Sequence, residues 1–165
     1  MKFDIDKVFI EKANLDDIDK MILIIHRCLR EVNCKDYTYY ELERFISEFN
    51  VEYLRDIISN RHIYCVKYCG EIIGMGGVNR DLSQEGQSYL TSLFINPDYH
   101  KLGIGKKLVC FLENEDVWCL DSSLIEIPSS KSSHKFYYKL GYKYRSYPPI
   151  FKDDGSTIMY KEKGL

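Results

Sequence analysis

The sequence has 165 residues, which is enough for one domain and short for two. Apolar residues make up 45% of it and the net charge is -2, so the composition is that of a globular protein without a global positive field for nucleic acid. The longest apolar run is far shorter than a membrane span, and the charged N-terminal segment lacks the apolar core of a signal peptide. We therefore expect a soluble cytoplasmic protein with a single domain over residues 1–165 and without nucleic-acid or membrane partners.

Residues 8–12 predict a short first strand, and the segment that follows predicts two helices. Asn14 can cap the first helix, whose apolar residues recur at alternating spacings of three and four. This apolar stripe consists of Leu15, Ile18, Ile22, Ile25, Leu29 and Val32. The second helix begins at the capping-box pattern TYYE, in which Thr38 caps the helix and Glu41 reaches back to the cap. Its stripe consists of Leu42, Phe45, Ile46 and Phe49.

The remainder of the chain predicts strands interrupted by two helices. The strand-like runs cover residues 62–69, 71–81, 87–95, 122–128, 142–148 and 156–163. One helix follows the loop GIGKK, and another, at 133–141, ends at Gly141. The predicted order is therefore β-α-α-β-β-β-α-β-α-β-β. This order describes a mixed α/β domain with an antiparallel meander, a crossover helix and a closing hairpin.

The six cysteines form no C-x-x-C pair, and no histidine stands at a zinc-finger spacing from them. They are Cys28, Cys34, Cys65, Cys69, Cys110 and Cys119. We expect free, mostly buried thiols in a reducing cytosol, and no bound metal.

The loop before the crossover helix carries the strongest functional signal. A helix N-terminus has backbone N–H groups without partners and a partial positive charge, both of which favour a phosphate. Gly103 and Gly105 allow a close approach, and Lys101, Lys106 and Lys107 add positive charge. The pattern fits neither the Walker loop nor the dinucleotide-binding fingerprint. By itself, GIG fits a tight turn into a core helix equally well.

Two motifs together resemble the GCN5-related N-acetyltransferase (GNAT) family. The family's loop reads Arg/Gln-x-x-Gly-x-Gly/Ala, and here His100 takes the first position while Gly103 and Gly105 fill the other two. Downstream, the family's Phe-Tyr-Glu-Lys-Leu-Gly-Phe is matched by FYYKLGY at 136–142. The resemblance implies the GNAT fold over nearly the whole chain, with a mixed, mostly antiparallel sheet flanked by helices.

The resemblance also implies acetyl-CoA as cosubstrate. The pyrophosphate would lie on the backbone of the loop and the pantetheine arm along the preceding strand, which a bulge splays from the strand at 122–128 in this family. Ser130 would hydrogen-bond the pantetheine or cap the next helix. The residues implied to bind the cosubstrate are Leu93, Phe94, Ile95, His100, Lys101, Leu102, Gly103, Ile104, Gly105, Lys106, Ser130 and Tyr137.

The implied reaction is direct attack of a primary amine, on a small molecule or a peptide, in a ternary complex. Tyr137 matches the family's tyrosine that protonates the leaving thiolate, and a backbone donor near Phe94 would stabilise the oxyanion. Thr91 stands where many relatives carry a glutamate, so the general base is open: another residue, a water chain, or none if the amine arrives deprotonated. The candidate residues are Glu126, Tyr89 and Glu31.

The acceptor site is expected between the first two helices and the closing strands. Its candidate residues are Glu31, Tyr37, Tyr39, Tyr40, Tyr147, Phe151, Asp153 and Asp154. Other functions stay open: a non-catalytic acyl-CoA-binding or sensing module, an interaction protein with a decayed cofactor site, or a transferase that uses a longer acyl-CoA. The resemblance includes a homodimer among the open oligomeric states.

Overall fold

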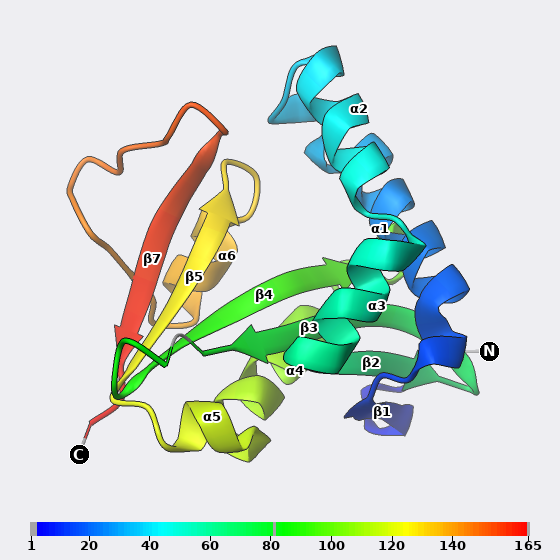
Figure 1. The fold of residues 1–165 in the computed structure, drawn as a ribbon, viewed down its shortest axis with the longest axis horizontal. Coiled ribbons are helices and arrows are strands. Elements are labelled where there is room, and N and C mark those ends of the chain that lie inside the picture. Colours follow the sequence, from blue (N-terminus) through cyan, green and yellow to red (C-terminus); the bar gives the residue numbers. More distant parts are fainter. Residues whose placement is uncertain (1–2, 81, 165) are drawn as a thin grey trace.

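The computed structural model describes residues 3–80 and 82–164, which form a seven-stranded sheet with helices on both faces (Figure 1). In chain order the strands are β1 (Val8–Lys12), β2 (His62–Tyr68), β3 (Glu71–Asn79), β4 (Gln87–Ile95), β5 (Leu124–Ser130), β6 (Lys143–Tyr144) and β7 (Ser156–Glu162). Across the sheet the order is β1-β2-β3-β4-β5-β7-β6, and all neighbours are antiparallel except β4 and β5. The predicted mixed, mostly antiparallel sheet is confirmed. Residues 1, 2, 81 and 165 of the predicted domain, including the end of the predicted run at 71–81, lie outside the described residues.

Six α-helices and four 3-10 turns complete the described chain. They are η1 (Ile5–Lys7), η2 (Leu15–Asp17), α1 (Ile18–Glu31), η3 (Asn33–Lys35), α2 (Tyr39–Glu48), α3 (Val51–Asn60), η4 (Pro97–Tyr99), α4 (Ile104–Glu115), α5 (Val117–Leu120) and α6 (His134–Lys139). The sequence did not predict α3 or α5. Helix α3 begins anew after Phe49 because the Asn50 side chain accepts a hydrogen bond from the Tyr53 N–H (3.0 Å) and caps it.

The predicted first helix begins later than expected. Asn14 does cap, but the structure it caps is η2: its side chain accepts from the Asp16 N–H (2.9 Å), and the Asp17 carboxylate accepts from the Asn14 N–H (2.9 Å). Leu15 lies in this turn and is 52% exposed, so the buried stripe starts at Ile18 instead. The capping box at Thr38 is present as predicted and starts α2.

Each face of the sheet has its own hydrophobic core. On one face, Ile63 and Cys65 of β2 belong to the core that α1, α2 and α3 share, with α2 packed on α1. On the other face, the alternate residues of the same strand, Tyr64 and Val66, belong to the core beneath α4, and α6 packs on β5 and β7. Alternation along a strand sends successive side chains to opposite faces, so this strand serves both cores. Gly76 of β3 allows α4 to lie close, because a Cβ there would stand 2.9 Å from Leu108 Cδ2.

The sheet opens in its middle. β4 and β5 pair only between Gln87–Tyr89 and Leu124–Glu126, and then diverge, as Figure 1 shows. The β3–β4 register shifts between Met75 and Gly77, and Ser92 takes a positive φ of 54°. This bulge turns β4 away from β5. Beyond Tyr89, the backbone edge of β4 that faces β5 therefore borders an opening and has no strand partner.

The cysteines are less buried than expected. Cys28, Cys65 and Cys119 are buried, whereas Cys34, Cys69 and Cys110 are exposed, and all six are free thiols. The expectation of mostly buried thiols is thus met for half of them. None of the helices that the structure describes combines the length and apolar character needed to cross a bilayer.

Candidate active site

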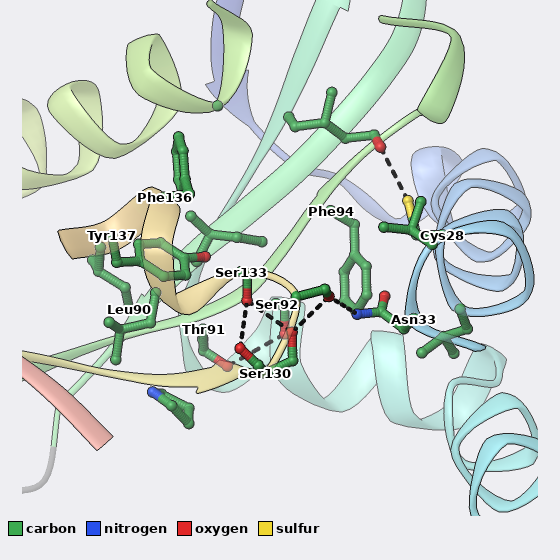
Figure 2. A pocket seen from close by; sticks show the side chains of 18 of the residues that line it. Cys28, Asn33, Leu90, Thr91, Ser92, Phe94, Ser130, Ser133, Phe136 and Tyr137 are labelled. Atoms are coloured by element: carbon green, nitrogen blue, oxygen red, sulfur yellow. Dashed lines mark hydrogen bonds between the residues drawn. The ribbon is translucent and has the colours of Figure 1, made fainter. Parts of the chain in front are cut away.

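A cleft of about 850 Å³ occupies the opening between β4 and β5. Its lining comes from α1 to α3, β4, the loop into α4, β5 and α6. In Figure 2, Phe136 and Tyr137 of α6 lie on one side of the cleft, and Cys28 and Asn33 lie on the other. After the donor and acceptor sites expected from the sequence, we call the half beside α4 the donor end and the half beside α2 and α3 the acceptor end.

The donor end is built from backbone. Gly103 is the N-cap of α4, has a φ of +84°, and provides no side-chain cap to the first N–H groups of the helix. No heavy atom outside its chain neighbours lies within 4 Å of where its Cβ would be, so the space in front of the helix is open. Gly105 lies against α6, since a Cβ there would be 3.1 Å from Phe136 Cζ. The free N–H groups and the helix dipole make this end suited to an anion.

The loop that leads to this end is fixed by side chains. His100 Nε2 lies 2.7 Å from the Ile95 carbonyl oxygen, which can only accept, so the ring N–H donates. Arg27 of α1 donates to Asn96 Oδ1 (3.0 Å) and pairs with Asp98 (2.9 Å). The hydrogen bonds to Arg27 lower the pKa of the Asp98 carboxyl. The loop is therefore anchored to both β4 and α1.

Most residues predicted to bind the cosubstrate line the cleft. Those that do are Leu93, Phe94, Ile95, His100, Lys101, Gly103, Ile104, Gly105, Lys106, Ser130 and Tyr137. Leu102 does not line it and is 38% exposed. Lys107 was expected to add charge near the loop, but its ammonium instead donates to the Ile5 carbonyl (2.9 Å), on the N-terminal segment.

Tyr137 lies between the donor end and the middle of the cleft. Its ring packs edge-on against Phe136 (4.9 Å between centroids) and Tyr142 (5.9 Å), and only 6% of the residue is exposed. Burial raises the pKa of its phenol well above the ordinary value of about 10. Its hydroxyl points into the cleft in Figure 2 and makes no hydrogen bond to a described residue. The Tyr137 phenol therefore stays protonated at neutral pH.

Hydroxyl groups line the cleft where β4 and β5 separate. Ser130 Oγ lies 2.8 Å from Ser133 Oγ, and Thr91 Oγ1 lies 3.3 Å from Ser92 Oγ (Figure 2). The N-cap of α6 is Ser133, and no side chain caps the helix. Of the two roles expected for Ser130, capping is therefore not what the structure has.

The three residues expected as general bases lie outside the cleft lining. Glu126 pairs with Arg145, the Tyr89 hydroxyl donates to Gln84 (3.4 Å), and Glu31 pairs with Arg27 (2.8 Å). Glu48 and Asp154 are the carboxylates among the described lining residues. The Ser156 hydroxyl donates to Asp154 Oδ1 (2.6 Å) and lowers the pKa of that carboxyl, which weakens it as a base.

The acceptor end is lined chiefly by aromatic side chains. They are Tyr37, Phe45, Phe49, Tyr53 and Phe94. Of the residues expected here, Tyr37 and Asp154 line the cleft, whereas Tyr39, Tyr40 and Tyr147 point to solvent and Phe151 packs on His134 (5.4 Å). Three of these aromatic residues were not predicted as site residues. Phe45 and Phe49 fit a core stripe, and Tyr53 lies on the unpredicted helix α3.

A family model described as "Acetyltransferase (GNAT) domain" matches residues 33–162. The chain belongs to the GNAT acetyltransferase family. The match spans most of the chain and includes both motifs that carried the resemblance, so the family expected from the sequence is confirmed. No curated protein matches the sequence.

Solved structures share the fold of this GNAT chain at low sequence identity. PaiA N-acetyltransferase from Thermoplasma acidophilum, in complex with coenzyme A, is 20% identical over 94% of this chain and 99% of its own, with a TM-score of 0.78. A GCN5-related N-acetyltransferase from Rhodopseudomonas palustris is 16% identical over 94% and 95%, with a TM-score of 0.76. N-acetylglutamate synthase from Neisseria gonorrhoeae, complexed with coenzyme A and L-arginine, is 16% identical, with a TM-score of 0.67; the match covers 94% of this chain and 33% of that one.

Proposed function

We propose that this protein transfers the acetyl group of acetyl-CoA to a primary amine by direct attack in a ternary complex. The observation that carries the proposal is the continuity of one cleft, from the open N-terminus of α4, along the unpaired edge of β4, to the Tyr137 hydroxyl. Family membership and the coenzyme A bound in two structures of the same fold support it.

The donor end has the chemistry that a coenzyme A molecule requires. The backbone from His100 to Lys106 would hold the pyrophosphate, aided by the charges of Lys101 and Lys106. The pantetheine amides would pair with the edge of β4 at Leu93 and Phe94, as a strand added to a sheet. The Ile95 carbonyl already accepts from His100 and Cys28, so Ile95 would contact the arm through its side chain. Ser130, across the opening, would hydrogen-bond the arm.

The reaction moves one proton from nitrogen to sulfur. The amine nitrogen attacks the thioester carbonyl carbon, the carbon–sulfur bond breaks, and its electron pair leaves on sulfur. A backbone N–H of β4 near Phe94 would stabilise the oxyanion, and Tyr137 would protonate the thiolate. A phenol with a raised pKa is a reluctant acid towards water, but it stays protonated throughout the neutral range, as this role requires. The amine loses its proton to water that enters along the serine-lined opening.

Direct attack is preferred to an acetyl-cysteine intermediate because of the state of Cys28. Among the described residues it is the cysteine that lines the cleft. Its thiol donates to the Ile95 carbonyl (3.0 Å), and burial raises its pKa to about 12. The thiolate is the nucleophilic form of cysteine, so this thiol is a poor candidate for carrying an acetyl group.

Initial-rate kinetics with both substrates varied test the proposal. We expect intersecting double-reciprocal lines, an N-acetylated amine identified by mass, and retained activity in Cys28→Ala. Parallel lines together with an inactive Cys28→Ala would contradict direct attack. We also propose that the protein is cytoplasmic and forms a homodimer. Light scattering of the purified protein tests the homodimer.

A non-catalytic acyl-CoA-binding module is the second candidate. One observation favours it: among the described lining residues, both carboxylates are engaged, Glu48 with Arg44 (3.6 Å) and Asp154 with Ser156. This candidate predicts stabilisation by acetyl-CoA without acetylation of any amine.

A further inference from the structure

The acceptor end of the cleft is lined by two groups of aromatic rings, which we together call the aromatic wall. Tyr37 and Phe45 meet edge-to-face at 4.9 Å, and Phe49 meets both Tyr53 (5.2 Å) and Phe94 (5.4 Å) in the same way. The rings come from the turn before α2, from α2 and its C-terminus, from α3 and from β4. Edge-to-face pairs hold rings in fixed positions, so the wall is a preformed surface.

The rings of the wall pack on the core on one side and face the cleft on the other. All five rings pack on the core formed by α1, α2 and α3, yet each stays partly exposed and lines the cleft. His26 of α1 donates its ring N–H to the Phe49 carbonyl (3.0 Å), which fixes the junction of α2 and α3 where the wall turns. Phe94 stands on β4 and is labelled in Figure 2. The pantetheine arm would follow this strand, so the wall would begin beside the thioester.

Few carboxylates accompany these rings. Glu48 and Asp154 are the carboxylates among the described lining residues. Glu48 pairs with Arg44 (3.6 Å), whereas Asp154 accepts a hydrogen bond from the Ser156 hydroxyl and keeps its negative charge. The Arg44 guanidinium that pairs with Glu48 also lies over the Phe45 ring (5.2 Å to the centroid). Among the described lining residues a polycation would therefore find a single carboxylate without a cationic partner, Asp154, whereas an apolar body would cover ring surface and release water.

We propose that the acceptor is a primary monoamine on an aromatic or apolar body, of the arylalkylamine class, rather than a polyamine or an amino acid. This inference rests on the proposed transferase function. The body packs on the rings of Phe45 and Tyr53, and the amine reaches past Phe94 to the thioester carbonyl. The reaction is the one given above: a carbon–nitrogen bond forms, the carbon–sulfur bond breaks, and the amine proton is balanced by the thiol proton.

The test is a panel of amines with saturating acetyl-CoA: phenethylamine and tryptamine, then putrescine and spermidine, then glycine and glutamate. We expect kcat/KM for the aryl amines to exceed that of the other two groups by about tenfold or more, the range that cation–π and apolar contacts supply. In Phe45→Leu and Tyr53→Leu this preference falls about tenfold, while the KM for acetyl-CoA is unchanged. Phe9→Leu, at an exposed position of β1, is the matched control and keeps the preference.

A binding readout keeps the inference testable without turnover. Phenethylamine should raise the unfolding midpoint of the CoA-saturated wild type, and neither wall variant should show this rise although CoA still stabilises it. Faster acetylation of spermidine or glutamate, or wall variants with unchanged preference, would overturn the inference alone. If no amine of the panel is acetylated, the proposed function is overturned, and this inference with it.

Discussion

The two ends of the cleft differ in the groups that line them: backbone groups at the donor end and side chains at the acceptor end. The donor end consists of backbone: the open N–H groups of α4 beyond Gly103 and the unpaired edge of β4. The acceptor end consists of side chains, the aromatic rings carried by α2, α3 and β4. Backbone can recognise only what every coenzyme A molecule shares, whereas side chains can be exchanged without disturbing the fold. The comparison suggests that donor identity is a property of the family and acceptor identity a property of this chain.

Substitution of Tyr137, at the junction of the two ends, should have the larger effect on turnover. In Tyr137→Phe we expect kcat to fall about 100-fold, as is typical for loss of a general acid, with the KM for acetyl-CoA within about twofold. Because burial raises the pKa of this phenol, wild-type kcat should show no falling limb between about pH 7 and about pH 9. Stopped assays of CoA release over this range measure both.

Tyr138→Phe is the control, because this neighbour is 60% exposed and does not line the cleft. Equal loss in both variants, or a wild-type rate that falls with deprotonation near neutral pH, would argue against Tyr137 as the proton donor.

Substitution of Asp36 should have a smaller effect, confined to the acceptor end. Ser132 donates its N–H (3.2 Å) and its hydroxyl to Asp36 Oδ2, which joins the turn before α2 to the loop between β5 and α6 across the cleft. Asp36→Ala removes this link, for which about 1 kcal/mol is a typical net value. We expect the KM for the amine to rise about threefold to fivefold, with little change in the KM for acetyl-CoA.

Asp56→Ala is matched in charge and removes an exposed hydrogen bond from Asn60 (2.8 Å) on α3, away from this link. It should leave both KM values unchanged. A rise in the KM for acetyl-CoA alone in Asp36→Ala would assign the link to the donor end.

Sequence reasoning reached the donor end because its constraints are local. The loop glycines and the FYYKLGY segment carry their meaning in consecutive residues, and the α2 capping box did as well. The break between α2 and α3 was not predicted because Asn50 follows Phe49 without a glycine or proline. The last apolar residue of the α2 stripe was therefore expected to mark the end of the helical segment. Because α3 was not predicted, Tyr53 was not among the expected site residues.

The acceptor end could not be predicted for a different reason. A phenylalanine on an apolar stripe looks the same whether it closes a core or lines a cleft, and only the divergence of β4 from β5 decides between them. The same holds for the residues expected as general bases: Glu126 and Glu31 have suitable chemistry, but they lie outside the cleft lining, paired with Arg145 and Arg27. The residue types showed which side chains have suitable chemistry, but the sequence did not show which of them the fold places in the cleft.

The most direct test of the account is coenzyme A binding by Gly103→Trp beside Gly70→Trp. Both glycines have a φ of +84° and nothing within 4 Å of a Cβ, so both variants bear a similar backbone cost of about 1–2 kcal/mol. Thermal unfolding with and without acetyl-CoA is the measurement; binding at 100 times the dissociation constant adds about 2.7 kcal/mol. We predict stabilisation of the wild type and Gly70→Trp and none of Gly103→Trp. Equal stabilisation of both variants, or none of the wild type, would contradict a coenzyme site at the α4 N-terminus.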